Sequence, residues 1–142
     1  SPNAIRPWQH VLEPLSGYLQ LALMLDSKIH GESYNFGPST INKYSVNDLV
    51  SEMKKSLNDL RWVSKNQKKD SFYESGLLML NCDKALNDLN WYSAMNFEQT
   101  VKMTSEWYRD ANKNNSLEIT LKQIEEYRDF AIEKGLMWTD LF

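Results

Sequence analysis

The sequence predicts an α+β domain in which helices dominate and the strands are short. Apolar residues recur at helical spacing in several stretches, and two capping patterns mark the starts of helices. Short aromatic or aliphatic runs also lie beside Gly and Pro residues, which is typical of strands. We expect a single domain, residues 1–142, because 142 residues with 42% hydrophobic content can bury one core.

The first stretch joins an extended run to an apolar helix. Pro7 biases Arg6 away from helical geometry and removes one ladder donor, so Ile5 to Val11 is predicted to be extended at an edge. A helix is predicted from Leu12 to about Asp26 to Lys28, with Pro14 tolerated in its first turn.

The apolar pattern of this first helix predicts a broad apolar surface. Its stripe comprises Leu12, Leu15, Leu19, Ala22 and Leu23. Apolar residues off that stripe are Leu21, Met24 and Leu25. A helix that is apolar nearly all round needs cover on more than one side, which a partner or a second copy of the chain would supply.

The middle of the chain predicts one short strand and one helix. The strand is Ser33 to Phe36, ended by Gly37-Pro38-Ser39. Ser45 and Asp48 form a capping pair, and a helix is expected from Val46 to about Leu60. Arg61 to Ser64 could pair as a strand, and residues 66–70 are expected to be a solvated loop.

The second half of the chain is predicted to be mostly helical. Leu77 to Leu80 could be a buried strand or part of a helix, and Asp83 to Leu89 one or two helical turns. Asn96 with Gln99 caps a helix reaching about Asn112, and Thr120 with Gln123 is expected to cap the last helix before Gly135. The predicted inward stripe of the Asn96-capped helix is Phe97, Val101, Thr104, Trp107 and Tyr108.

Composition excludes several classes of function. A net charge of −3 and an isoelectric point near 5.4 provide no basic surface field, which argues against nucleic acid as a partner. The single cysteine, Cys82, excludes an internal disulfide and fits a reducing cytoplasm. No apolar run is long enough to span a membrane, and two histidines, His10 and His30, give little support for a metal site.

The segment RPWQHVLEPLSGYL, which starts at Arg6, resembles the opening of the substrate-binding portion of extended short-chain dehydrogenases/reductases, and within them the CDP-glucose 4,6-dehydratase family. The resemblance continues through YNFGPS, LNCDKALNDLNW, TVKMTSEWYRD and ITLKQIEEY, and covers nearly the whole chain in order. It implies a helix-rich substrate-binding domain without the Rossmann dinucleotide-binding domain, which would precede it in the intact enzyme.

The resemblance implies that NAD serves the intact enzyme and is held by that N-terminal domain. The five glycines here are too scattered to form the glycine-rich turn that approaches a pyrophosphate. The family's catalytic tyrosine works with a lysine four residues later, which no tyrosine here has. The residues at that spacing are Ala22, Pro38, Asp48, Leu77, Asn96, Asn112 and Ala131. We therefore expect no catalytic or cofactor-binding residue in this chain, and no activity from it alone.

Arg6 is the first candidate for binding the nucleotide-sugar, because it matches the family's arginine and a guanidinium can bond a pyrophosphate through two donors. A surface ion pair is the alternative role. Trp8 is expected to serve packing, and His10 to be a hydrogen-bonded structural histidine.

The second candidate region is the loop from Asp70 to Gly76, which matches a histidine-rich, Glu-containing loop of the family. Only Glu74 is retained from that pattern, and Tyr73 stands where histidine is expected. We expect Glu74 to accept from ribose hydroxyls, with Tyr73 beside it, or else to be a solvated carboxylate. Thr40 is a further polar candidate, by its position after Gly37-Pro38.

The sequence thus predicts the CDP-glucose-binding part of a 4,6-dehydratase-like enzyme, which converts CDP-glucose to CDP-4-keto-6-deoxyglucose when intact. The alternative is a non-catalytic interaction domain in which the first helix binds a partner or a second copy, giving a homo-oligomer. Substitution of Leu21 or Met24 by Glu is expected to disrupt that association.

Overall fold

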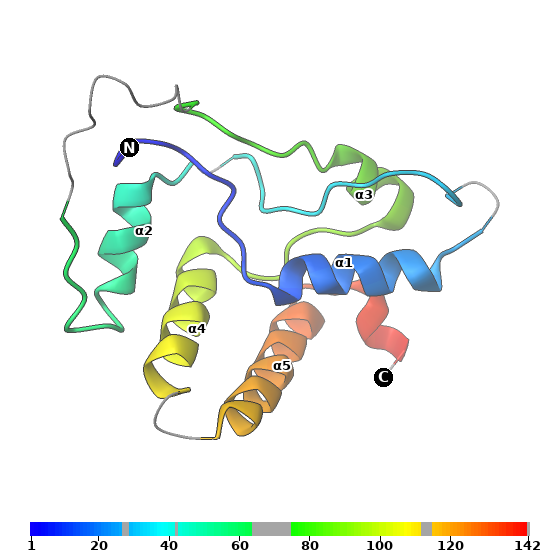
Figure 1. The fold of residues 1–142 in the computed structure, drawn as a ribbon. Coiled ribbons are helices and arrows are strands. Elements are labelled where there is room, and N and C mark those ends of the chain that lie inside the picture. Colours follow the sequence, from blue (N-terminus) through cyan, green and yellow to red (C-terminus); the bar gives the residue numbers. More distant parts are fainter. Residues whose placement is uncertain (27–28, 42, 64–74, 112–114, 142) are drawn as a thin grey trace.

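The computed structural model describes residues 1–26, 29–41, 43–63, 75–111 and 115–141. Its helices are α1 (Leu12–Leu23), α2 (Val46–Met53), α3 (Asp83–Leu89), α4 (Phe97–Asp110), α5 (Ser116–Glu133) and the 3₁₀ helix η1 (Met137–Leu141) (Figure 1). The described residues contain two isolated β-bridges and no strand, so the predicted α+β class is wrong in its β part. In the described ranges these two bridges do not continue into a ladder.

Both bridges meet at Ile5. It pairs antiparallel with Ser45 and parallel with Leu77, and its N–H donates to the carbonyl of Gly76 at 2.8 Å. The N–H of Arg6 donates to the carbonyl of Tyr44 at 3.4 Å. The run before Pro7 is therefore flanked on both sides, and the predicted edge position is wrong for Ile5. These contacts bring Arg6 beside two distant parts of the chain.

The helix α1 begins at Leu12 as predicted and ends at Leu23, before the predicted Asp26 to Lys28. None of the residues in its predicted apolar stripe is buried. The buried residues of α1 are Glu13, Ser16, Gly17 and Gln20. Exposed apolar residues of this region are Val11, Leu15, Tyr18, Leu19, Leu23 and Leu25. Leu21 and Met24, which we predicted to be available for association, instead pack against a buried cluster.

The helix α2 starts at the predicted capping box. The Ser45 hydroxyl accepts from the Asp48 N–H at 3.2 Å, and an Asp48 carboxylate oxygen accepts from the Ser45 N–H at 2.7 Å. The helix ends at Met53, and turns replace the rest of the helix predicted to Leu60. Residues 61–63 form no strand, and the remainder of the predicted loop lies outside the described residues.

The segment before α3 is more exposed than predicted. Leu77 and Leu78 are each about half exposed, so the buried-strand interpretation of Leu77 to Leu80 is wrong. The helices α3 and α4 occupy their predicted positions, and the Asn96/Gln99 capping box is present. Tyr108, predicted to point inward, is exposed.

The last long helix starts one turn earlier than predicted. The Asn115 side chain, not Thr120, accepts from the Leu117 N–H at 3.0 Å and caps α5. The predicted stop at Gly135 is confirmed: Gly135 has a φ of 69°, its N–H donates to Ile132, and the Leu136 N–H donates to Ala131. This pair of bonds is a Schellman motif.

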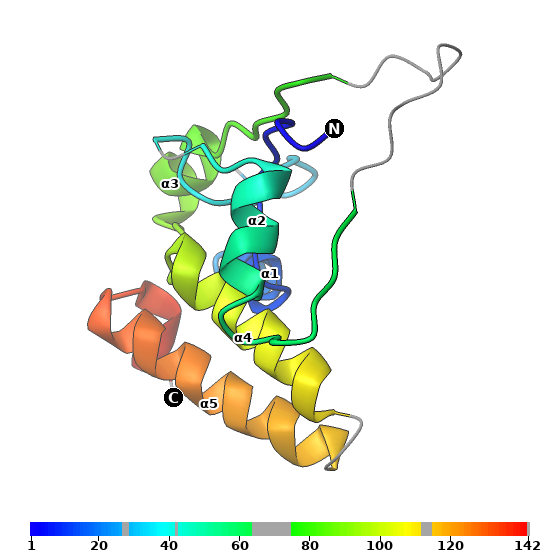
Figure 2. The same ribbon diagram turned by 90° about the vertical axis from the view of Figure 1, so that its left-hand side faces the viewer.

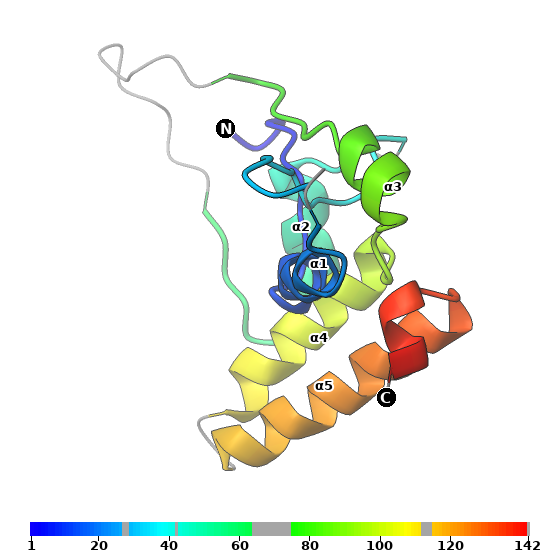
Figure 3. The same ribbon diagram turned by 90° about the vertical axis from the view of Figure 1, so that its right-hand side faces the viewer.

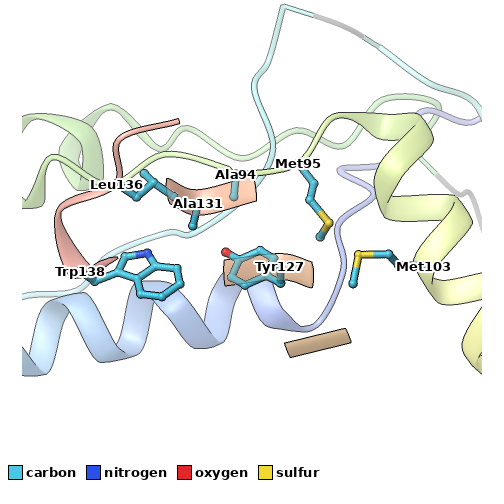
Figure 4. Close-up of a cluster of buried hydrophobic side chains, with 7 residues drawn as sticks. All are labelled: Ala94, Met95, Met103, Tyr127, Ala131, Leu136 and Trp138. Atoms are coloured by element: carbon cyan, nitrogen blue, oxygen red, sulfur yellow. The ribbon is translucent and has the colours of Figure 1, made fainter. Parts of the chain in front are cut away.

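Two buried clusters hold the helices together. Figure 2 shows α4 and α5 side by side, with α2 above α4, in agreement with their packing contacts. The larger cluster joins α4, α5 and η1 and comprises Ala94, Met95, Met103, Tyr127, Ala131, Leu136 and Trp138 (Figure 4). The smaller one, beside α1 and α3, comprises Phe36, Ala85, Leu89 and Trp91. Residues 91–96, between α3 and α4, link the two clusters.

Candidate functional site

The segment after Ile5 lines a cleft between α4 and two extended segments. We call it the Arg6 cleft; its volume is about 80 Å³. Its lining residues are Arg6, Pro7, Trp8, Pro38, Ser39, Tyr44, Met79, Leu80, Met95, Asn96, Phe97 and Thr100. The Arg6 Nη1 donates to the Ile5 carbonyl at 2.7 Å. A guanidinium carries a permanent charge and several donors, which are the groups that bind anions in proteins.

Aromatic rings form one wall of the Arg6 cleft. The rings of Tyr44 and Phe97 stack with centroids 3.8 Å apart and planes 5° apart. The Trp8 Nε1 donates to the Tyr44 carbonyl at 3.1 Å, and Trp8 is half-buried, which agrees with its predicted packing role. Burial raises the pKa of the Tyr44 phenol, so its hydroxyl remains a neutral donor near pH 7.

A larger hollow adjoins the Arg6 cleft and contains Thr40. Its volume is about 580 Å³, within the range of small-molecule sites, whereas the Arg6 cleft alone is too small for a nucleotide-sugar. The two hollows share Pro38, Ser39, Met95 and Asn96. We call these two adjoining hollows together the Arg6–Thr40 groove. Of the four predicted site residues, Arg6 lines the smaller hollow and Thr40 the larger one.

Tyr73 and Glu74 lie outside the described residues, so their predicted roles stay predictions. The sequence interpretation missed Asn96 as a groove residue, because its capping pattern accounted for it fully. Its Oδ1 does accept from the Gln99 N–H at 2.8 Å. No group in the described ranges accepts from its side-chain Nδ2, and Asn96 is exposed where the two hollows meet.

His10 has the structural role predicted for it. It is buried, and its Nδ1 accepts from the Leu12 N–H at 3.3 Å, which satisfies a donor at the start of α1. Burial lowers the pKa of the imidazole, so His10 is neutral near pH 7. The ring must be neutral for this bond, because the Nδ1 of a protonated imidazole carries a hydrogen and cannot accept from the Leu12 N–H.

Glu13, which the sequence interpretation also missed, accepts hydrogen bonds from the turn that carries Met95 of the groove. Glu13 is 0% exposed, and its Oε1 accepts from Ser93 Oγ at 2.9 Å and the Met95 N–H at 2.8 Å. Its Oε2 accepts from the Ala94 N–H at 3.0 Å and the Tyr127 hydroxyl at 3.0 Å. Four donors saturate the carboxylate, which thereby positions the turn carrying Met95.

Tyr127 and Ser16 extend this Glu13 network. The Tyr127 hydroxyl lies 2.8 Å from Ser16 Oγ, and Ser16 Oγ accepts from Trp91 Nε1 at 3.0 Å. Burial, and then the nearby Glu13 charge, raise the pKa of the Tyr127 phenol, so it stays a protonated donor. The sequence did contain a signal for this network, namely Glu13 in the first turn of an otherwise apolar helix. A charged side chain in that position needs either solvent or hydrogen-bond partners.

Packing contacts or a positive φ angle explain four of the five glycines. Gly17 lies under the Phe36 ring, where a Cβ would come within 2.4 Å of a ring carbon. A Cβ on Gly37 would come within 2.9 Å of Leu80. Gly31 and Gly135 have positive φ angles, as turn and helix-end residues do. Packing and chain direction therefore account for these four glycines.

The groove offers a guanidinium, an amide and hydroxyl groups, which are donors for phosphate and sugar oxygens. The described residues contain no group of three or more His, Cys, Asp or Glu side chains that could hold a metal ion. In the same part of the chain no helix is long and apolar enough to cross a membrane.

No protein-family model matches the chain. The chain is 31% identical over 131 residues to CDP-glucose 4,6-dehydratase from Salmonella typhimurium, and the match covers 89% of this chain. It confirms the resemblance seen in the sequence motifs. The chain spans 36% of the length of this relative.

Proposed function

We propose that this chain is the nucleotide-sugar-binding part of an enzyme similar to CDP-glucose 4,6-dehydratase. The observation that carries the proposal is the position of Arg6, the residue matching the family's arginine, in a cleft that shares four lining residues with the hollow containing Thr40. The similarity to the Salmonella enzyme over 89% of the chain supports the same substrate class.

In this proposal the Arg6 guanidinium binds the pyrophosphate, because it carries a permanent charge and several donors in one plane. The Asn96 amide and the Ser39 and Thr40 hydroxyls lie along the same groove and would bind ribose or sugar oxygens. The stacked Tyr44 and Phe97 rings supply an apolar wall. Tyr73 and Glu74 are proposed to contact the ribose from the adjoining loop.

Hydride transfer is assigned in this proposal to the remainder of the enzyme. NAD would be bound there, and the glycines described here take no part in holding it. This chain would bind and orient CDP-glucose without catalysing its conversion, so we expect the purified chain to have no dehydratase activity.

The test is a calorimetric titration of the chain with CDP-glucose, beside UDP-glucose and dTDP-glucose. CDP-glucose should bind best, and Arg6→Ala should weaken binding by about 10-fold or more, the size of a lost charge-assisted bond. Lys43→Ala is the matched control, because Lys43 is an exposed cation that does not line the groove. Equal binding by Arg6→Ala and the parent chain would refute the pyrophosphate role.

The exposed apolar surface of α1 favours a second candidate, an interaction domain. If this is the sole function, none of the three nucleotide-sugars will bind and the chain will self-associate or bind a protein. The relevant substitutions are Leu19→Glu and Leu23→Glu on the exposed side, since Leu21 and Met24 pack inward.

A further inference from the structure

A separate hollow lies where the start of α1 meets α4 and α5. Figure 3, a view along α1, shows α4 and α5 running below that helix. The volume of the hollow is about 320 Å³, which is within the range of small-molecule sites. It shares no lining residue with the Arg6–Thr40 groove, and we call it the His10 pocket. Its polar and aromatic lining includes His10, Thr104, Trp107, Thr120 and Gln123.

His10 presents a hydrogen-bond donor that the described part of the chain does not use. The side chain is 7% exposed, and its Nδ1 accepts from the Leu12 N–H. A neutral imidazole whose Nδ1 accepts carries its hydrogen on Nε2, and no described residue accepts from this Nε2. The fully buried side-chain atoms without a partner are Gln9 Oε1, Ser105 Oγ and Trp138 Nε1 in the same ranges. His10 Nε2 is not among them, so it is accessible from the pocket that His10 lines.

Gln123 presents the complementary group, an acceptor. It is also 7% exposed, and its Nε2 donates to the Met103 carbonyl at 2.6 Å. A carbonyl can only accept, so this bond fixes which end of the amide is the nitrogen. No donor among the described residues reaches the Gln123 Oε1, which is likewise not fully buried. Polar groups of side chains this buried are normally paired, so one pocket holds an unused donor and an unused acceptor.

The other polar groups named in the lining already have partners within the chain. The Trp107 Nε1 donates to Thr120 Oγ1 at 3.0 Å, which fixes the orientation of the indole ring. The hydroxyls of Thr120 and Thr104 donate to carbonyls of their own helices at 2.7 and 2.9 Å. None of the described residues that line the pocket is Asp, Glu, Lys or Arg. The pocket is therefore uncharged, with an indole beside the two unused groups.

We propose that the His10 pocket binds a small uncharged molecule that combines a planar ring with an amide group. The amide oxygen accepts from His10 Nε2, the amide N–H donates to Gln123 Oε1, and the ring lies against Trp107. A charged molecule fits less well, because no counter-charge lines the pocket and burial of an unpaired ion is costly. An apolar molecule leaves both polar groups unsatisfied.

The test is an NMR titration of the ¹⁵N-labelled chain with benzamide, which has the ring and the amide and no charge. Benzamide should bind with a dissociation constant of about 1 mM or lower, as small ligands in well-formed pockets do. The resonances that move should be those of the pocket residues, including the His10 ring Nε2. Benzoate, which is charged, and toluene, which lacks the amide, should bind at least about 10-fold more weakly.

The variant His10→Asn removes the donor and keeps an acceptor for the Leu12 N–H, because an asparagine oxygen can replace Nδ1 at a helix start. It should weaken benzamide binding by about 10-fold or more. His30→Asn is the matched control, since His30 is exposed and does not line the pocket, and it should bind as the parent does. If His10→Asn does not fold, the His10 ring resonance of the parent chain still reports the contact.

Four results would overturn the proposal. Unchanged pocket resonances at about 10 mM benzamide would show that water satisfies the two groups. Equal binding of toluene would show a merely apolar hollow. Displacement of benzamide by CDP-glucose would place it in the Arg6–Thr40 groove. Loss of binding in a folded hybrid, the Salmonella enzyme with residues 1–142 in place of the matching segment, would show that the rest of the enzyme fills the pocket. Failure of the proposed nucleotide-sugar binding would leave this proposal standing, because the sites share no lining residue.

Discussion

The helices α1 and α4 have similar lengths and opposite relations between sequence and burial. In α4 the buried residues are Thr100, Val101, Met103 and Ser105, and exposed positions include Lys102 and Arg109. In α1 the buried residues are polar or small, and the exposed ones are aliphatic or aromatic. The predicted stripe of α4 therefore includes one buried residue, Val101, and one exposed residue, Tyr108, whereas the predicted stripe of α1 includes no buried residue.

The difference has a specific cause. The α1 face packed inward is built around the Glu13 network, in which four donors satisfy one buried carboxylate. Gly17 on the same face admits the Phe36 ring. The apolar residues on the other face then remain for a partner. An apolar stripe identifies the side of a helix that is buried in the final assembly, and this side need not face the chain's own core.

Removing the Glu13 carboxylate should have the largest effect on this comparison. Glu13→Ala removes the shared acceptor of four donors, including the buried N–H groups of Ala94 and Met95, and should lower the free energy of unfolding by about 3–5 kcal/mol. Urea denaturation measures it, with Glu118→Ala, an exposed first-turn carboxylate of α5, as the control. A loss below about 1 kcal/mol would show that the network does not hold α1 in place.

Truncation of one apolar residue on each helix gives the next largest contrast. Met103→Ala on α4 removes a side chain that is 1% exposed and should cost about 2–4 kcal/mol, while Leu19→Ala on α1 should cost less than about 0.5 kcal/mol. Equal losses in chemical denaturation would contradict the reversed orientation of α1.

Alkaline pH should weaken the α1 attachment through Tyr127. Its pKa is raised on folding, so below about pH 10 the phenol is protonated in both states and its bond to Glu13 stabilises the fold. Above that pH the unfolded chain releases the proton first, and the free energy of unfolding falls by up to about 1.4 kcal/mol per pH unit. Tyr127→Phe should lack this component, whereas Tyr18→Phe, at an exposed hydroxyl, should keep the parent profile.

The smallest effect concerns the helix starts. The Asn96 side chain caps α4, whereas no side chain of the residue before α1 caps that helix. Asn96→Ala should cost about 1 kcal/mol, and Val11→Ala less than about 0.5 kcal/mol, in thermal or chemical denaturation. If both substitutions cost the same, the capping box is not what stabilises the α4 start.

Part of the candidate site could be predicted from sequence. Arg6 and Thr40 both line the groove. Asn96 could not be recognised as a groove residue, because its role as a helix cap already accounts for an asparagine at this position. Its neighbours in the groove are also far away along the chain. Ser39 and Tyr44 likewise reach the groove through packing between distant segments.

The sequence by itself determined the local events: the capping boxes at Ser45 and Asn96, the helix end at Gly135, and helix formation from Leu12. These depend on residues a few positions apart, so their patterns are complete within a short stretch. The tertiary structure alone decided that α1 turns Glu13 inward, because the donors come from residues 93–95 and from Tyr127. It also left Ser33 to Phe36 without a ladder, since strand pairing depends on a neighbour that no local pattern supplies.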